Sequence, residues 1–102
     1  MIRLGPADSF HHFPALIGEG LRTYFLVKEA DGFVLLSNIC PHERSSVYDK
    51  GTCFECPLHG WQFDRRTGRC LNEPERSLAV FPVVAEDGIL FADIPHHAKA
   101  LD

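Results

Sequence analysis

The chain has 102 residues, enough for one domain over residues 1–102 with one hydrophobic core. Its formal net charge of −4 at pH 7 argues against a nucleic-acid-binding protein, which usually presents a basic surface. The first residues lack the apolar core of a signal sequence, and no run approaches the roughly 18 apolar residues of a membrane span, so we expect a cytoplasmic protein.

Short apolar segments flank turn residues at three places along the chain, and each place predicts a β-hairpin. In chain order the paired segments are 21–27 and 33–36 around Asp31-Gly32, 63–64 and 70–71 around 65–68, and 78–84 and 89–94 around Asp87-Gly88. Convincing helical periodicity with capping residues is absent from the sequence. The pattern therefore predicts an all-β fold.

The first and last hairpins are expected to form the base of the domain, a small antiparallel β-sandwich. Residues from about 38 to 74 lie between these hairpins in the sequence and would form an inserted lobe.

Two short segments in that lobe carry metal-ligand residues in the same order. Residues 40–42 read Cys-Pro-His, and residues 56–59 read Cys-Pro-Leu-His. A [2Fe-2S] cluster with two cysteines on one iron and two histidines on the other takes one of each from each segment. A structural zinc ion is the alternative, but zinc fingers usually group cysteines at one end and histidines at the other. The candidate ligands are Cys40, His42, Cys56 and His59.

Residues next to these ligands suit a cluster-binding loop. A proline follows each ligand cysteine, and proline restricts the preceding residue to extended conformations. Gly60 follows His59 directly, and we expect it to allow a close approach of the backbone where a side chain would collide.

The segments 56–64 and 67–70 resemble the second cluster loop and following strand of oxygenase-associated Rieske domains. Residues 81–83, together with Asp87-Gly88 and 94–95, resemble the final hairpin of that family. The resemblance covers roughly residues 20 to 95, and the chain is identified as a member of the Rieske-type [2Fe-2S] ferredoxin family. It implies the Rieske iron–sulfur fold and one Rieske-type [2Fe-2S] cluster.

The same resemblance implies a function in electron transfer. The two cysteines would bind the buried iron, and the two histidines would bind the outer iron near the surface, where the electron leaves. The chain would be a soluble one-electron carrier and not itself an enzyme. Its partners would be an NAD(P)H-dependent, flavin-containing reductase and an iron oxygenase.

Two other functions share this domain type. One is the small Rieske subunit of a nitrite reductase. The other is the isolated cluster domain of a Rieske oxygenase, which would need a separate mononuclear iron bound by two histidines and a carboxylate.

Two residues near the second segment indicate a low reduction potential. Respiratory-chain Rieske proteins carry an additional cysteine in each cluster loop and hydroxyl groups near the cluster. This chain has Leu58 at the position of the second-loop cysteine and Phe63 near the cluster. Fewer donors to sulfur stabilise the reduced state less, so the resemblance implies the low-potential branch.

The remaining cysteines and histidines are not expected to bind a metal. Cys53 and Cys70 are expected to be thiols, with a disulfide between them as the alternative. Adjacent residues of an extended chain point to opposite sides, so the pairs His11-His12 and His96-His97 are poor chelators of one ion. We also expect Trp61 to pack beside the second loop and residues 73–76 to form a turn over the cluster.

Overall fold

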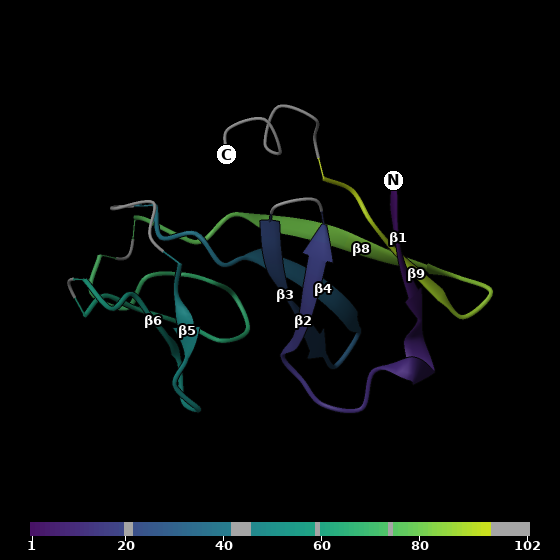
Figure 1. The fold of residues 1–102 in the computed structure, drawn as a ribbon, viewed down its shortest axis with the longest axis horizontal. Coiled ribbons are helices and arrows are strands. Elements are labelled where there is room, and N and C mark those ends of the chain that lie inside the picture. Colours follow the sequence, from purple (N-terminus) through teal and green to yellow (C-terminus); the bar gives the residue numbers. More distant parts are fainter. Residues whose placement is uncertain (20–21, 42–45, 59, 74, 95–102) are drawn as a thin grey trace.

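The computed structural model describes residues 1–19, 22–41, 46–58, 60–73 and 75–94, and the regular secondary structure in this part of the chain is almost entirely β (Figure 1). The elements are β1 (Ile2–Pro6), the 3₁₀ turn η1 (Ala7–Ser9), β2 (Ala15–Glu19), β3 (Arg22–Glu29), β4 (Gly32–Ser37), β5 (Tyr48–Asp49), β6 (Phe54–Glu55), β7 (Gln62–Phe63), β8 (Val80–Glu86) and β9 (Ile89–Ala92). The predicted all-β class is confirmed. No helix in the described ranges is long and apolar enough to cross a membrane.

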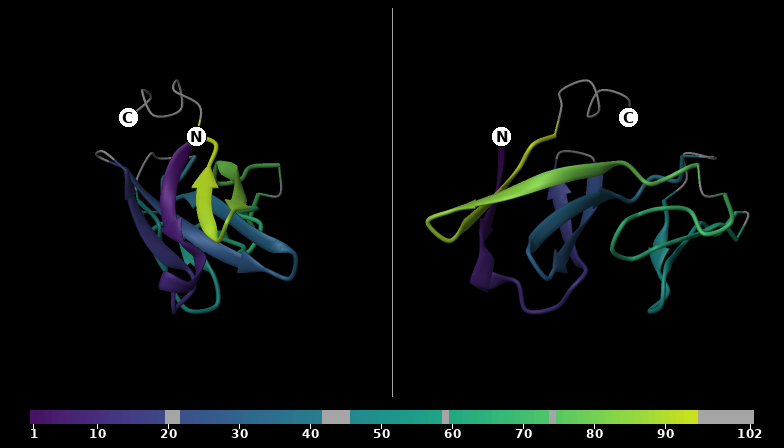
Figure 2. Two further views of the ribbon diagram at one scale, coloured as in Figure 1. Left: turned by 90° about the vertical axis from the view of Figure 1, so that its right-hand side faces the viewer. Right: turned by 180° about the vertical axis from the view of Figure 1, so that it is seen from behind.

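Six strands form one antiparallel sheet in the order β1-β9-β8-β4-β3-β2. The predicted first and last hairpins are β3–β4 and β8–β9, and they join directly because β4 pairs with β8. The two edge strands, β1 and β2, were not predicted. Ile2 of β1 and Ile17 of β2 pack against the same core from opposite edges of the sheet, so the sheet curls over that core (Figure 2).

The hairpin turns follow the predictions with one shift. Asp87 and Gly88 form the turn of the last hairpin, and both have positive φ angles, 53° and 80°, as a tight two-residue turn of this type requires. In the first hairpin Glu29 pairs with Gly32, so the turn residues are Ala30 and Asp31, one position earlier than predicted. Gly32 instead opens β4 with a φ of 151°, a conformation that a side chain would disfavour.

Strand β3 carries apolar residues on both faces because both faces are buried. Tyr24 and Leu26 point into the core of the base, and Phe25 and Val27 point into a second core in the lobe. Successive side chains of a strand alternate between faces, which explains the unbroken apolar run in its sequence.

The lobe contains a second, smaller sheet in the order β5-β6-β7. Its core is attached to the base through the rings of Phe25 and Phe54, which stack with centroids 4.2 Å apart and planes inclined by 10°. Figure 1 shows this lobe at the opposite end of the molecule from the turn between β8 and β9. The inserted lobe is therefore present where the sequence predicts it.

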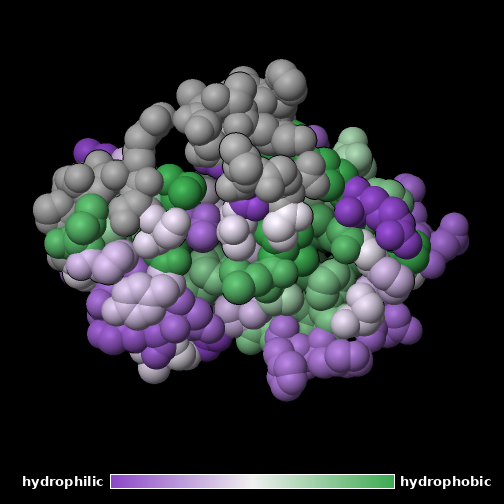
Figure 3. Space-filling model, viewed as in Figure 1, coloured by the Kyte–Doolittle hydropathy of each residue, from purple (hydrophilic) through white to green (hydrophobic). Residues whose placement is uncertain are grey.

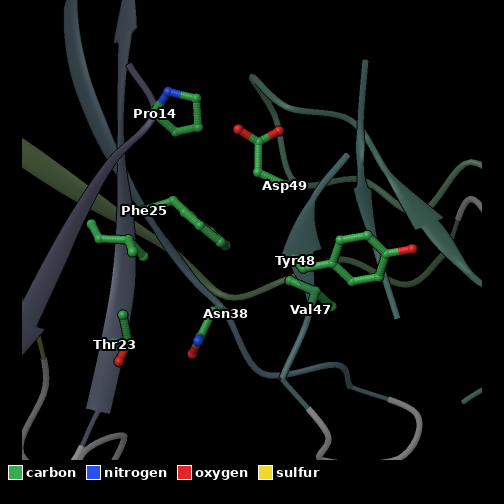
Figure 4. Close-up of a pocket in the computed structure, with 8 residues that line it drawn as sticks. Pro14, Thr23, Phe25, Asn38, Val47, Tyr48 and Asp49 are labelled. Carbon is green, nitrogen blue, oxygen red and sulfur yellow. The ribbon is translucent and has the colours of Figure 1, made fainter. Parts of the chain in front are cut away.

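A pocket of about 390 Å³ separates the base from the lobe on one flank (Figure 4). Its walls come from β2 and β3 on one side and from residues 47–49 on the other. Leu16 at this pocket is 68% exposed, and Figure 3 shows apolar surface over this middle part of the molecule. Beside the open flank, the Phe25–Phe54 stack joins the two parts.

Candidate metal centre

Cys40 lies just after β4, in a segment held by backbone and hydroxyl hydrogen bonds. The Ser37 hydroxyl accepts a hydrogen bond from the backbone N–H of Ile39 at 3.1 Å. The N–H of Val47 donates to the carbonyl of Asn38 at 2.7 Å, which brings the far end of the loop back to its start. The Cys40 side chain is fully buried.

Cys56 follows β6 directly and begins a closed loop. Its N–H donates to the carbonyl of Trp61 at 2.8 Å, and the N–H of Gly60 donates to the carbonyl of Cys56 at 2.9 Å. Cys56 is also fully buried. The two loops therefore start from fixed positions, one after strand β4 of the base and one after the middle strand β6 of the small sheet.

Gly60 makes no close approach to the described residues, so the predicted reason for it stays a prediction. A Cβ at this position would meet nothing within 4 Å among the described residues, and the glycine serves the loop through its positive φ of 70°. Close approach occurs instead at Gly68, where a Cβ would lie 3.3 Å from Leu36 Cδ2.

Both candidate ligand cysteines contribute to one apolar core, together with Phe54 and Phe63. Thiolates are the ligands that iron–sulfur clusters require, and this core shields the two sulfurs from water. His42 and His59 lie outside the described residues, so the complete ligand set stays a prediction. The two buried thiols in one core fit the cysteine half of a cluster site.

The other cysteines and histidines lie outside the candidate ligand set. Cys53 and Cys70 are buried and form no disulfide with each other. The Cys70 sulfur accepts a hydrogen bond from the N–H of Glu73 at 3.3 Å. His11 and His12 are exposed, whereas His96 and His97 lie outside the described ranges.

The segment after Cys70 forms a turn, and its predicted position over the cluster stays a prediction. The N–H of Arg76 donates to the carbonyl of Glu73 at 2.9 Å, and Pro74 between them lies outside the described residues. The Arg76 guanidinium lies 5.8 Å from the centroid of the Trp61 ring, which itself packs against the lobe core. Trp61 thus has the packing role that the sequence predicts.

A carboxylate beside Cys56 was missed in the sequence. Glu55 in β6 accepts hydrogen bonds from the Tyr48 hydroxyl at 2.7 Å, from Gln62 Nε2 at 3.0 Å and from Lys50 Nζ at 3.0 Å. These donors, with Tyr48 first, lower the pKa of Glu55 to about 2. No local pattern indicates this network, because it depends on the register of the small sheet, in which Tyr48 and Gln62 both lie opposite Glu55.

Asp64 holds the turn that follows β7, and its charge predicts a pH dependence. Its carboxylate accepts hydrogen bonds from the backbone N–H groups of Thr67 and Arg66, both at 2.8 Å, and these lower its pKa below the ordinary value of 3.8. A depressed folded-state pKa stabilises the fold above pH 3.8, and this stabilisation is lost as the pH falls further.

Asp64→Ala is therefore expected to lower the free energy of unfolding by about 1–2 kcal/mol near neutral pH, with a smaller difference at about pH 3. Denaturant unfolding of both proteins across this range measures the difference. A difference that stays constant down to pH 3 would contradict an ionised Asp64 as its source.

Two loops that each begin at a cysteine buried in one core, on a small antiparallel lobe carried by a β base, fit an iron–sulfur site. Residues 13–82 match the Rieske [2Fe-2S] domain, and the chain belongs to this family. Its cofactor is one Rieske-type [2Fe-2S] cluster.

Individual relatives include both small carriers and larger enzymes. The ferredoxin component of the p-cumate 2,3-dioxygenase system of Pseudomonas putida is 34% identical over 70 residues, which are 64% of this chain and 59% of that protein. Cholesterol 7-desaturase of Xenopus laevis is 39% identical over 64 residues, which are 58% of this chain but 13% of the desaturase. The chain thus spans less than two thirds of each of these relatives.

A solved structure covers more of the chain. The ferredoxin of Sphingomonas yanoikuyae B1 superposes with a TM-score of 0.63 at 27% identity, over 92% of this chain and 98% of the ferredoxin. The similarity therefore extends over nearly the whole of both chains.

Proposed function

We propose that this chain is a Rieske-type ferredoxin that accepts one electron from an NAD(P)H-dependent flavin reductase and passes it to an iron oxygenase. Cys40, His42, Cys56 and His59 would hold the cluster, which supplies reversible one-electron chemistry when bound. The observation that carries the proposal is the burial of Cys40 and Cys56 in one core of a Rieske domain. The likeness to a ferredoxin over nearly its whole length supports a carrier over an enzyme.

The residues of the chain prepare the site without taking part in a chemical conversion. The lobe core keeps water from the two sulfurs, and the backbone hydrogen bonds of the second loop hold its ends together. A protein that only accepts and releases an electron needs such a fixed, dry site and a partner surface.

The experiment that tests this function uses the purified protein. We expect a coloured protein with two iron and two sulfide per chain, as one [2Fe-2S] cluster requires, that is reduced by NADH only when a flavin-dependent ferredoxin reductase is added. A colourless protein that contains zinc would contradict the proposal. Oxygenase turnover supported by the reduced protein would establish the downstream step.

The match to a desaturase favours a second candidate, the cluster domain of a larger Rieske oxygenase. The nitrite reductase subunit is a further alternative of the same domain type. Electron delivery to a sirohaem protein, compared with delivery to an oxygenase, distinguishes a nitrite reductase subunit from an oxygenase-linked carrier.

The reduction potential is expected at the low end of the Rieske range, nearer about −150 mV than +300 mV. Phe63 is fully buried in the core that contains Cys40 and Cys56, so this position offers no hydroxyl donor to sulfur. Phe63→Tyr should raise the potential if its hydroxyl reaches a ligand sulfur. Protein-film voltammetry measures the potential of both proteins, and a clearly positive wild-type value near neutral pH would contradict the low-potential assignment.

Partner docking is predicted at the surface around His42 and His59, which Glu43, Arg44, Trp61, Pro74 and Arg76 would flank. Of these, Trp61 and Arg76 are described, and Arg76 is exposed beside the second loop. Arg76→Glu should change the rate of reduction by the reductase and its salt dependence, because rim charges act mainly on association. The control is Glu86→Lys, at the end of β8 near the far turn (Figure 1). Stopped-flow kinetics in which only Glu86→Lys altered the rate would place docking on another face.

A further inference from the structure

The three short strands of the lobe are joined at one carboxylate. Glu55 lies in the middle strand β6, and its carboxylate accepts from Tyr48 of β5 and Gln62 of β7, its cross-strand neighbours on either side. Lys50, just beyond β5, adds an ion pair at 3.0 Å. One side chain therefore contacts every strand of the small sheet.

Buried rings of Phe54 and Phe63 and the hydrogen bonds of the flanking loops also hold the small sheet, but its own backbone ladder is short. Each of its strands has two residues, so its backbone ladder is short, whereas sheets of independent stability are usually longer. Hydrogen bonds to an ionised group are about twice as strong as those between neutral groups. Figure 4 shows the Tyr48 hydroxyl directed away from the pocket, on the side of the lobe strands.

The position of Glu55 in the chain connects this network to the metal site. The residue that follows it is Cys56, whose thiol is fully buried and whose N–H closes the second loop on Trp61. The Glu55 side chain itself is only 16% exposed, compared with 46% for Lys50. The carboxylate thus fixes the backbone directly before a ligand cysteine.

We propose that Glu55 is a positioning residue, whose carboxylate holds β6 between β5 and β7 so that Cys56 presents its thiolate to the cluster. This inference rests on the proposed ligation by Cys56. It concerns a residue that neither binds the cluster nor transfers an electron. An ordinary surface ion pair, which contributes little, is the competing interpretation.

The test compares Glu55→Ala with a matched carboxylate variant in the same lobe. Asp64→Ala is the control, because Asp64 also accepts short hydrogen bonds but holds only the turn after β7. The readouts are the rate at which visible absorbance is lost in an iron chelator and the EPR spectrum of the reduced protein. The loss rate of each variant is measured at a temperature equally far below its own thermal unfolding midpoint.

Glu55→Ala is expected to lose its cluster about tenfold faster than the wild type, in the range typical for loss of outer-shell support. Its EPR lines should broaden because Cys56 is held in several arrangements. Asp64→Ala should keep the wild-type spectrum and a loss rate within about twofold of the wild type, since Asp64 supports no ligand loop. The double variant Tyr48→Phe with Gln62→Leu keeps the carboxylate but removes two of its donors, so it should reproduce part of the effect. This double variant replaces Glu55→Ala in the test if Glu55→Ala fails to fold.

Equal loss rates and unchanged spectra in Glu55→Ala and Asp64→Ala would overturn the positioning role. If Glu55→Ala does not fold, a double variant with wild-type loss rate and spectrum overturns it as well. A wild-type protein without iron and sulfide would instead refute the proposed function, and a Cys56→Ala protein that keeps its cluster would refute the ligation on which this inference rests.

Discussion

Replacement of Cys56 by alanine is expected to abolish the [2Fe-2S] cluster. Cys56 is fully buried in the lobe core, and the alanine methyl group that replaces its thiolate cannot bind iron. Because the core excludes water, no water molecule can fill the open coordination position of the iron. Iron and sulfide analysis with visible and EPR spectra measures the loss. Cys40→Ala should behave in the same way.

The controls are the two cysteines that the ligand pattern does not use. Cys53→Ser and Cys70→Ser should each retain the iron and sulfide content of the wild type. Burial makes both changes somewhat destabilising, and Cys70→Ser also alters the acceptor of the Glu73 N–H. Loss of the cluster in either serine variant, in a protein that still folds, would mean that the ligand thiols are assigned wrongly.

Phe54→Ala is expected to lower the free energy of unfolding by about 3–5 kcal/mol, as is typical for truncation of a buried aromatic side chain. Phe54 is fully buried in β6 and stacks on Phe25 of β3, so its loss leaves a cavity where the lobe meets the base. Anaerobic denaturant unfolding followed by circular dichroism measures the change. Because many small domains have a total stability of only about 5–15 kcal/mol, the variant should be close to unfolding at 37 °C.

The matched control for this cavity is Leu16→Ala. Leu16 is apolar but 68% exposed at the open flank, so its truncation should change stability by less than about 0.5 kcal/mol. If Phe54→Ala were as stable as Leu16→Ala, the aromatic stack would not be what attaches the lobe to the base.

Local sequence patterns predicted the features that depend on near neighbours in the chain. Asp87-Gly88 predicted its turn because two positive φ angles in succession select such residues. The Cys-Pro-His and Cys-Pro-Leu-His segments predicted the cofactor, since ligand type and order follow from the chemistry of the two irons. Phe63 indicated few hydroxyl donors near the cluster, and the structure buries Phe63 fully in the core that contains Cys40 and Cys56.

Contacts between distant segments were decided only by the tertiary structure. Strands β1 and β2 take the two edges of the base although neither segment carries a clear period or turn signal, because their partners β9 and β3 supply the pairing. Gly68 has a φ of 77°, and a Cβ there would lie 3.3 Å from Leu36 Cδ2, so the close packing at this glycine depends on a residue far away in the sequence.

Glu55 shows the same division between sequence and structure at the metal centre. By itself the sequence determined the cofactor, the two cysteine-bearing segments and the all-β class of this protein. Only the folded sheet placed Tyr48, Lys50 and Gln62 around one carboxylate next to Cys56. The candidate ligands are identified by a few adjacent residues. The side chains that position those ligands are brought together by strand register, which forms only when separate segments pair.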